Sequence, residues 1–332
     1  MLKRINVLAV FLFGLGTLVN GQTINSPYSR YGLGDILPAQ NILNRGMGGI
    51  GTAYADYQSI NFRNPASYGV LQTVTLDFGV EVDNLTIRST NPVNKFSNSS
   101  PIISYINIGL PLAIRKKKVW GLVFGLRPMT RINYKILRSE RLNGGGLNDS
   151  VATLFEGNGG IQQAYVGTGV RIGRFTAGVN VGYVFGSKDY NTRRIFLNDT
   201  VAYYKANYET KTNINGLLLN AGAQYIAQLN KTMFLRLGVQ GNWQQTLRGS
   251  RNVKRETFDY DANSASFKID SVFSSAEEKG DIIMPASYSF GAVLEKSGKF
   301  LVGIDYTASK WSDYKFYNET DQVQDSWELH LG

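Results

Sequence analysis

Residues 175–185 read FTAGVNVGYVF, and every odd-numbered position in this stretch is apolar. The positions between them hold Thr176, Gly178, Asn180, Gly182 and Val184. A period of two is typical of a β-strand with one apolar face. The same period recurs in further segments along the chain, so the sequence predicts a protein that is overwhelmingly β. These segments are residues 73–82, 102–113, 119–127, 161–172, 217–229, 233–243, 286–295 and 300–308.

The apolar faces suit contact with lipid better than burial in a soluble β-sandwich, which is the alternative fold. A tilted membrane strand needs about 9 to 11 residues, and the lengths of these segments are close to that value. Strands of soluble proteins usually have about 5 or 6 residues. No apolar face carries a charge, and a Lys or Arg facing lipid costs about 2 to 4 kcal/mol. The other faces are rich in glycine and poor in charge, unlike a solvated surface. We therefore predict an all-β, antiparallel up-and-down transmembrane β-barrel over residues 71–332.

The connections between these segments alternate between long and short. Outer-membrane barrels have long extracellular loops and short periplasmic turns. The alternation therefore predicts a location in the outer membrane of a Gram-negative bacterium, with lipid and lipopolysaccharide as surroundings. The long connections are residues 83–101, 128–160, 186–216 and 244–285, and the short ones are 114–118, 173–174, 230–232 and 296–299.

The amino-terminal residues 1–21 read MLKRINVLAVFLFGLGTLVNG. A basic start, an apolar stretch from Val7 to Val19 and small residues at the end are typical of a secretory signal peptide. We predict cleavage after Gly21; an uncleaved amphipathic anchor is the alternative. No later run of about 18 apolar residues follows, so any crossing of a membrane must use strands.

The composition excludes several kinds of chemistry. The chain has no cysteine and a single histidine, His330, so we expect no disulfide, no lipoprotein anchor, no metal site and no bound cofactor. Paired acids at Glu277 and Glu278 lie in polar sequence, where solvation explains them, and a catalytic serine motif is absent. We expect no enzyme. The formal net charge of +10 is weak support for nucleic-acid binding, and we expect none.

Residues 22–70 lack the alternation and form a separate segment. It opens with Ser26-Pro27-Tyr28-Ser29-Arg30-Tyr31-Gly32 and continues with a glycine cluster, an acid and Asn-Pro-Ala just before the first strand. This series resembles the FadL family of outer-membrane transporters for hydrophobic molecules, as does Trp311-Ser312 near the other end. The matching positions are Gly46, Gly48, Gly49, Asp56, Asn64, Pro65 and Ala66.

The resemblance implies a barrel of about 14 strands closed by an amino-terminal plug, which would be residues 22–70. Only nine complete strands are legible, and a tenth at 326–332 stops soon after it begins. Because an open edge in lipid leaves backbone groups unsatisfied, we expect a sequence truncated at its carboxyl end. The alternative is that parts of the long loops, such as 130–138 with 149–157, enter the membrane as extra strands.

The resemblance also implies passive uptake of hydrophobic small molecules such as long-chain fatty acids, with such a molecule or a detergent as ligand. The alternative function is a non-transporting structural subunit of an outer-membrane secretion or protein-assembly complex, bound to other outer-membrane proteins. Several polar residues are candidates to face the lumen, where they contact a ligand or form stabilising hydrogen bonds in the interior. These candidates are Asn107, Arg127, Asn180, Gln224, Arg236, Gln240 and Asp305.

Overall fold

A computed structural model describes most of the chain after the predicted signal peptide, which lies outside the described residues. The described ranges are 25–90, 93–115, 118–144, 147–197, 203–261, 263 and 265–332. The chain divides into two compact units: Met1–Asn25 with Val80–Ile103, and Ser26–Gly79 with Ser104–Gly332. We refer to residues 22–70 as the plug segment and to the strands of the second unit as the wall.

The first unit contains the facing parts of two long strands, β2 (Thr75–Thr90) and β3 (Val93–Arg115). They are neighbours in the sheet. The expectation of a loop at 83–101 is therefore wrong, because the strand alternation continues beyond the apolar residues: Asp83, Leu85 and Ile87 are less exposed than Asn84 and Thr86 beside them.

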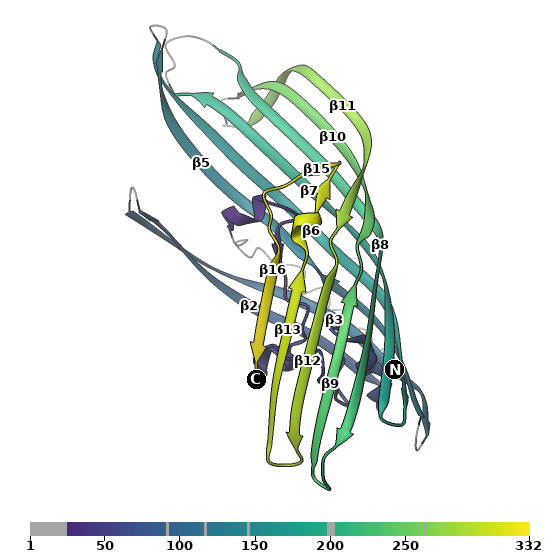
Figure 1. The fold of residues 1–332 in the computed structure, drawn as a ribbon. Coiled ribbons are helices and arrows are strands. Elements are labelled where there is room, and N and C mark those ends of the chain that lie inside the picture. The colour runs from purple at the N-terminus through teal and green to yellow at the C-terminus, as the bar shows by residue number, and fades with distance from the viewer. Residues whose placement is uncertain are drawn as a thin grey trace, which may run out of the picture. The chain divides into compact units, whose positions relative to one another are not determined.

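The wall of the second unit consists of antiparallel strands that follow one another in space nearly as they do along the chain (Figure 1). This arrangement confirms the predicted all-β, up-and-down architecture. Its strands are β4 (Lys118–Pro128), β5 (Thr130–Gly144), β6 (Leu147–Ile172), β7 (Phe175–Phe196), β8 (Lys205–Gln228), β9 (Met233–Asn242), β10 (Gln245–Tyr260), β11 (Ser266–Met284), β12 (Ser287–Lys296), β13 (Phe300–Ser309) and β16 (Ser326–Leu331).

Three strands, β6, β7 and β8, are continuous, whereas their neighbours are broken in the middle. Strands β4 and β5 both pair with β6, and β9 and β10 both pair with β8. Strand β12 then pairs with β9, and β11 pairs with β10. The two strands of each broken pair therefore lie end to end and together take one strand position in the sheet.

Side-chain amides replace the backbone hydrogen bonds that one of these breaks removes. The carboxamide of Gln245 accepts from the Leu219 backbone N–H at 2.6 Å and donates to the Leu219 carbonyl at 2.9 Å. Asn242 donates to the Pro285 carbonyl at 3.0 Å. Pro285 lies between β11 and β12, and a proline has no backbone N–H to donate. A buried backbone group without a partner is destabilising, so these amides make the interruption tolerable.

The long connections expected at 128–160, 186–216 and 244–285 are largely strand and not loop. Strand β5 and the first half of β6 fill the first of them, the ends of β7 and β8 fill the second, and β10 and β11 fill the third. The segment at 130–138 belongs to β5, a separate strand that pairs with β6, and the segment at 149–157 is the first part of β6, so strand structure is prolonged beyond the predicted segments. We refer to these prolonged parts together as the extension.

The outer face of the wall changes character where the extension begins. Along β7 the outward residues from Phe175 to Phe185, Ala177 included, are apolar and exposed. From Ser187 to Arg193 they are polar, and Asp189 forms an ion pair with Lys211 of β8 at 3.6 Å. The apolar belt therefore has the length that a membrane-spanning strand needs, and the extension has an outer face suited to water.

The plug segment contains little regular structure. It holds a short strand β1 (Asp35–Ile36), a five-residue helix α2 (Ile42–Gly46) and two 3-10 turns, η1 (Pro27–Arg30) and η2 (Pro65–Val70). Strand β1 pairs with β5, and all six residues of η2 are buried. Among the described residues, no helix is long and apolar enough to cross a membrane.

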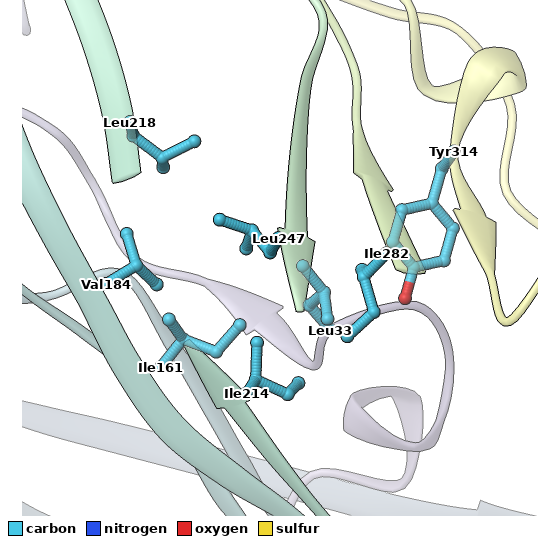
Figure 2. Packing of buried hydrophobic residues seen from close by; sticks show 8 residues of the cluster. All are labelled: Leu33, Ile161, Val184, Ile214, Leu218, Leu247, Ile282 and Tyr314. Carbon is cyan, nitrogen blue, oxygen red and sulfur yellow. The ribbon is translucent and has the colours of Figure 1, made fainter. Parts of the chain in front are cut away.

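A buried apolar cluster joins the plug segment to the inner face of the wall (Figure 2). Leu33 of the plug segment meets residues of β6, β7, β8, β10 and β11, and Tyr314 joins from the segment after β13. Burying one such aliphatic side chain stabilises a protein by about 1.5 to 3 kcal/mol. The wall members are Ile161, Val184, Ile214, Leu218, Leu247 and Ile282.

The segment after β13 turns onto the inner face of the wall through a two-residue hairpin between β14 (Lys315–Phe316) and β15 (Glu319–Thr320). Its turn residues Tyr317 and Asn318 have φ values of 54° and 63°, the combination of a type I′ turn. The Tyr317 ring lies over the paired glycines 249 and 280, where a Cβ atom would be 2.2 to 2.8 Å from it. Its hydroxyl donates to the Glu278 carbonyl at 2.9 Å.

Candidate functional site

The plug segment is shaped by asparagines that satisfy its own backbone. Asn41 caps α2 by accepting from the Asn44 N–H at 2.8 Å, and its amide donates to the Ile60 carbonyl at 3.0 Å. Asn64 caps η2 by accepting from the Ala66 N–H at 3.0 Å. Short polar side chains are favoured at these positions because they pair with otherwise unsatisfied N–H groups. The Asn-Pro-Ala motif is therefore a capped turn that enters the lumen.

Two glycines of the cluster are required by the backbone, and one is not. Gly48 and Gly49 have φ values of 69° and 86°, a region that favours glycine. A Cβ at Gly48 would lie 2.0 Å from the Leu331 carbonyl of β16, and one at Gly49 would lie 2.6 Å from the His330 ring. A Cβ at Gly46 would meet nothing within 4 Å. Gly48 and Gly49 thus allow close approach of the plug segment to β16.

Asp305 on β13 anchors the plug segment just after the glycine cluster. One carboxylate oxygen accepts from the backbone N–H groups of Gly51 and Thr52, both at 2.7 Å. Asp305 is completely buried, and hydrogen bonds to an ionised buried acceptor are stronger than neutral ones. Asp56, the acid of the predicted motif, has a local role, because it accepts from the N–H of Gln58 at 2.7 Å within a turn.

Three further hydrogen-bonding side chains join the plug segment to the wall, two from the wall and one from the plug segment. Gln224 of β8 donates to the carbonyls of Thr52 and Tyr54 at 3.0 and 3.2 Å. Arg236 of β9 donates to the Ala55 carbonyl at 2.7 Å and pairs with Glu295 at 3.1 Å. From the plug side, Asn64 donates to the Val239 carbonyl at 3.3 Å. Together with Asp305, these contacts fix residues 51–64 against β8, β9 and β13.

Glycines on the inner face of the wall make room for the plug segment. A Cβ at Gly238 would lie 2.2 Å from the Thr52 carbonyl, one at Gly178 would lie 2.3 Å from the Pro65 carbonyl, and one at Gly121 would lie 2.1 Å from the Tyr68 carbonyl. Heavy side chains at these positions would overlap the plug backbone. The inward-facing strand positions are rich in glycine because the strand backbone packs directly against the plug backbone there.

A buried polar group surrounds Arg63 of the plug segment. Its guanidinium donates to the hydroxyl of Thr307 on β13, and Gln240 of β9 donates to the Ser289 hydroxyl beside it at 2.7 Å. Burial lowers the pKa of Arg63, while the carboxylates of Asp305 and Glu328 act in the opposite direction. The Asp305 charge therefore serves both the plug backbone and this guanidinium.

Arg127 lies on the opposite side of the lumen, on β4. Its Nε donates to Gln163 at 3.1 Å, and its guanidinium lies 5.3 Å from the centre of the Phe62 ring. Nearby, Asn107 of β3 accepts from the Tyr165 hydroxyl at 2.7 Å. These aromatic residues belong to a second buried cluster, formed by Ile60, Phe62, Tyr68, Leu71, Tyr105, Val123 and Tyr165.

A cavity of about 630 Å³ remains between the plug segment and the wall. Its volume is within the range of sites that hold small molecules. Apolar lining comes from both sides, including Leu37 and Phe62 of the plug segment and Met129 and Trp311. Arg45, Arg63, Arg127 and Glu328 contribute charged lining, and about half of the lining residues are polar, so the cavity has a mixed apolar and polar lining.

The seven polar residues predicted to face the lumen all lie on strands of the wall. Four of them, Asn107, Asn180, Gln224 and Asp305, are buried away from the cavity lining, whereas Arg127 and Gln240 line it. Arg236 contacts the plug segment. Contact of any of them with a ligand stays a prediction.

Sequence reasoning did not find Arg63 and Asn61, although both flank the motif that it did find. Asn61 donates to the carbonyls of Gly51 and Tyr54 at 2.5 and 2.8 Å. The signal was the sequence Asn61-Phe62-Arg63-Asn64, an arginine and two amides in an otherwise apolar stretch of the plug segment. Among the described residues, no group of acids and histidines is placed to hold a metal ion.

Comparisons with known proteins identify a similar fold and a matching family. The crystal structure of the Ralstonia pickettii toluene transporter TbuX is similar, with a TM-score of 0.50 and 14% sequence identity. The match covers 89% of this chain and 82% of that one. At this identity the likeness concerns the fold alone, and it confirms the predicted all-β fold. A search of curated proteins finds no match. A family model named BamG, a name different from FadL, matches residues 1–332. The chain belongs to the BamG family.

Proposed function

We propose that this protein is a channel of the Gram-negative outer membrane for passive uptake of hydrophobic small molecules, long-chain fatty acids being one class. The observation that carries the proposal is the cavity of about 630 Å³ between the plug segment and the wall. Its volume is within the range of small-molecule sites, and its apolar surface from Leu37, Phe62, Met129 and Trp311 lies beside polar and charged groups, a combination suited to a solute with an apolar body and a polar end. TbuX, which shares the fold, is described as a toluene transporter, and a transport role requires no catalytic group.

The proposed route needs the plug segment to move. A solute in the cavity is enclosed by residues such as Leu37 and Phe62 on the plug side and Met129 on the wall side. The hydrogen bonds that the N–H groups of Gly51 and Thr52 donate to Asp305 are among those that hold the plug in place. A plug held by a limited set of polar contacts can rearrange without unfolding the strands, because the strand hydrogen bonds are separate from these contacts.

Uptake of a fluorescent fatty acid by cells that produce the protein tests this proposal. Ala39 lines the cavity, so Ala39→Trp places an indole in the proposed path and is expected to reduce uptake to the background of cells without the protein. The matched control is Ala177→Trp on the exposed outer face of β7, which should leave uptake unchanged. Uptake that is equal in wild-type, Ala39→Trp and protein-free cells would overturn the proposal.

The second candidate function is a structural subunit of an outer-membrane secretion or protein-assembly complex. The family name BamG favours this candidate, because it indicates a BAM-related role. A subunit of that kind should purify with other outer-membrane proteins from its native membrane, and its removal should lower the amount of several outer-membrane proteins. Loss of tracer uptake with no change in those amounts would favour the channel.

A further inference from the structure

The two faces of the extension differ in how they arrange their charges. On the outer face, three lysines form ion pairs with carboxylates on the neighbouring strand. Lys135 pairs with Glu156 at 3.0 Å, Lys268 pairs with Glu256 at 3.5 Å, and Lys211 pairs with Asp189 at 3.6 Å. Exposed pairs of this kind are expected of a surface in contact with water.

The inner face carries a row of side chains that runs across six strands. Strand register places its members directly beside one another from β5 to β11, and the parity of the strands puts them on the same side as the buried cluster of Figure 2. Three of the six are aromatic. We call this set the inner row; it consists of Ile136, Phe155, Thr192, Tyr208, Arg255 and Phe273.

Arg255 is the central group of the inner row. Its guanidinium lies 5.9 Å from the Tyr208 ring and 5.5 Å from the Phe273 ring, and both rings are about half exposed, at 48% and 47%. In the described part of the chain, no carboxylate is within ion-pair distance of Arg255. A guanidinium held between rings keeps N–H donors available for an external carboxylate.

Other arginines surround the inner row. Arg30 of η1 lies 4.9 Å from the Phe155 ring. Arg138 and Arg194 lie two positions beyond Ile136 and Thr192 of the row, on the same face. They share the single carboxylate of Glu140, at 3.4 and 3.5 Å. Strand register also places one further acid, Asp270, on this face beside Thr257. The four arginines 30, 138, 194 and 255 around the row therefore outnumber its two acids, Glu140 and Asp270.

The geometry of the row fits a chain molecule that lies across the strands. Neighbouring strands are about 4.8 Å apart, so Phe155, Tyr208 and Phe273, each two strands from the next, follow at roughly 10 Å. The flat faces of sugar rings stack on aromatic side chains, hydroxyls such as that of Thr192 hydrogen-bond to sugar hydroxyls, and guanidinium groups bind carboxylates in a bidentate manner. An extended peptide would need free backbone groups, and β8 and β10 are paired on both sides here.

We propose that the inner row of the extension binds an acidic polysaccharide from the surrounding medium. Lipopolysaccharide around the protein would meet the outer face, where Lys135, Lys211 and Lys268 are already paired with carboxylates, so a soluble chain is the occupant that the inner face fits. This inference does not depend on the proposed uptake of hydrophobic molecules, because the inner row is separate from the residues that line the cavity.

Binding of fluorescein-labelled polygalacturonate to the detergent-purified full chain, measured by fluorescence anisotropy, tests the proposal. We expect saturable binding that polygalacturonate competes away and that neutral dextran and purified lipopolysaccharide do not. Arg255→Gln should weaken binding by about ten-fold or more, since it removes a charge-assisted contact. Tyr208→Ser removes one stacking ring and should weaken binding as well.

The matched control is Lys254→Gln, which removes the same charge from the next residue of β10, on the outer face opposite Glu209. It should bind like the wild type. Unheated gel mobility confirms that each variant is folded. Absence of saturable binding, equal losses in Arg255→Gln and Lys254→Gln, wild-type binding by Tyr208→Ser, or stronger competition by lipopolysaccharide than by polygalacturonate would each overturn the proposal.

Discussion

The anchor formed by Asp305 gives the sharpest prediction. In Asp305→Ala, the N–H groups of Gly51 and Thr52 lose a shared acceptor that lies 2.7 Å from each, and Arg63 loses a nearby carboxylate. A hydrogen bond to a charged group contributes about 1.5 to 3 kcal/mol, so the loss of two destabilises the seated plug by roughly 3 to 6 kcal/mol before any relaxation. Because every 1.4 kcal/mol is tenfold, opening of the plug should become about 100-fold more frequent or greater.

Hydrogen exchange followed by mass spectrometry in detergent micelles measures that opening. Peptides that contain residues 48–56 should exchange about 100-fold faster in Asp305→Ala than in the wild type, while peptides from β6 and β7 keep their rates. The control is Asp313→Ala, an exposed acid in η3 (Trp311–Asp313). Wild-type exchange at 48–56 in Asp305→Ala would refute the anchoring role.

Three further substitutions test the packing of the wall. Gly238→Ala places a Cβ 2.2 Å from the Thr52 carbonyl and should lower stability by about 1 to 3 kcal/mol, measured as a lower melting temperature in micelles. Tyr317→Asn keeps a residue that tolerates a φ of 54° but removes the ring from the glycine pair; it should lower stability by about 1 to 2 kcal/mol and speed exchange in β10 and β11. Gln245→Ala leaves the Leu219 N–H and carbonyl without their side-chain partner and should destabilise by about 1 to 3 kcal/mol, seen as faster exchange around residue 219.

Each of these changes has a control of the same residue type. Gly46→Ala meets no atom within 4 Å and should be neutral or slightly stabilising, because alanine favours a helix over glycine. Tyr204→Asn alters an exposed ring, and Gln244→Ala alters the exposed neighbour of Gln245. If a control destabilises as much as its partner, the packing explanation for that position is wrong.

The sequence predicts the membrane part of the wall well because lipid selects residue types directly. Phe175 to Phe185 alternate since one side meets hydrocarbon and the other meets the plug. The extension was missed for the same reason. Beyond Ser187 both faces are polar, so strands held by cross-strand pairs such as Asp189 with Lys211 carry no apolar period. Strand pairing there depends on partners distant in sequence.

The site could be predicted in its parts and not in its assembly. The capped turn at Asn64 and the left-handed glycines at 48 and 49 have local signatures. Asp305 binds the N–H groups of Gly51 and Thr52 across more than 250 sequence positions. The alternation of apolar and polar residues does not predict a contact between residues so far apart in the sequence. Likewise, the interruption between β9 and β10 at residues 243–244 could not be predicted. The Gln245 side chain replaces the missing backbone hydrogen bonds, but in the sequence it looks like any other polar residue.

Accessibility of single spin labels along β7 tests most directly that the outer face of the wall meets lipid. The chain has no cysteine, so one cysteine at a time can be introduced at residues 175–194 and labelled in lipid vesicles. The account predicts high oxygen accessibility at the odd-numbered residues from 175 to 185, low accessibility at the even-numbered ones, and access to a water-soluble relaxation agent at the odd-numbered residues from 187 onward. Access of that agent to the odd-numbered residues between 175 and 185 would contradict it.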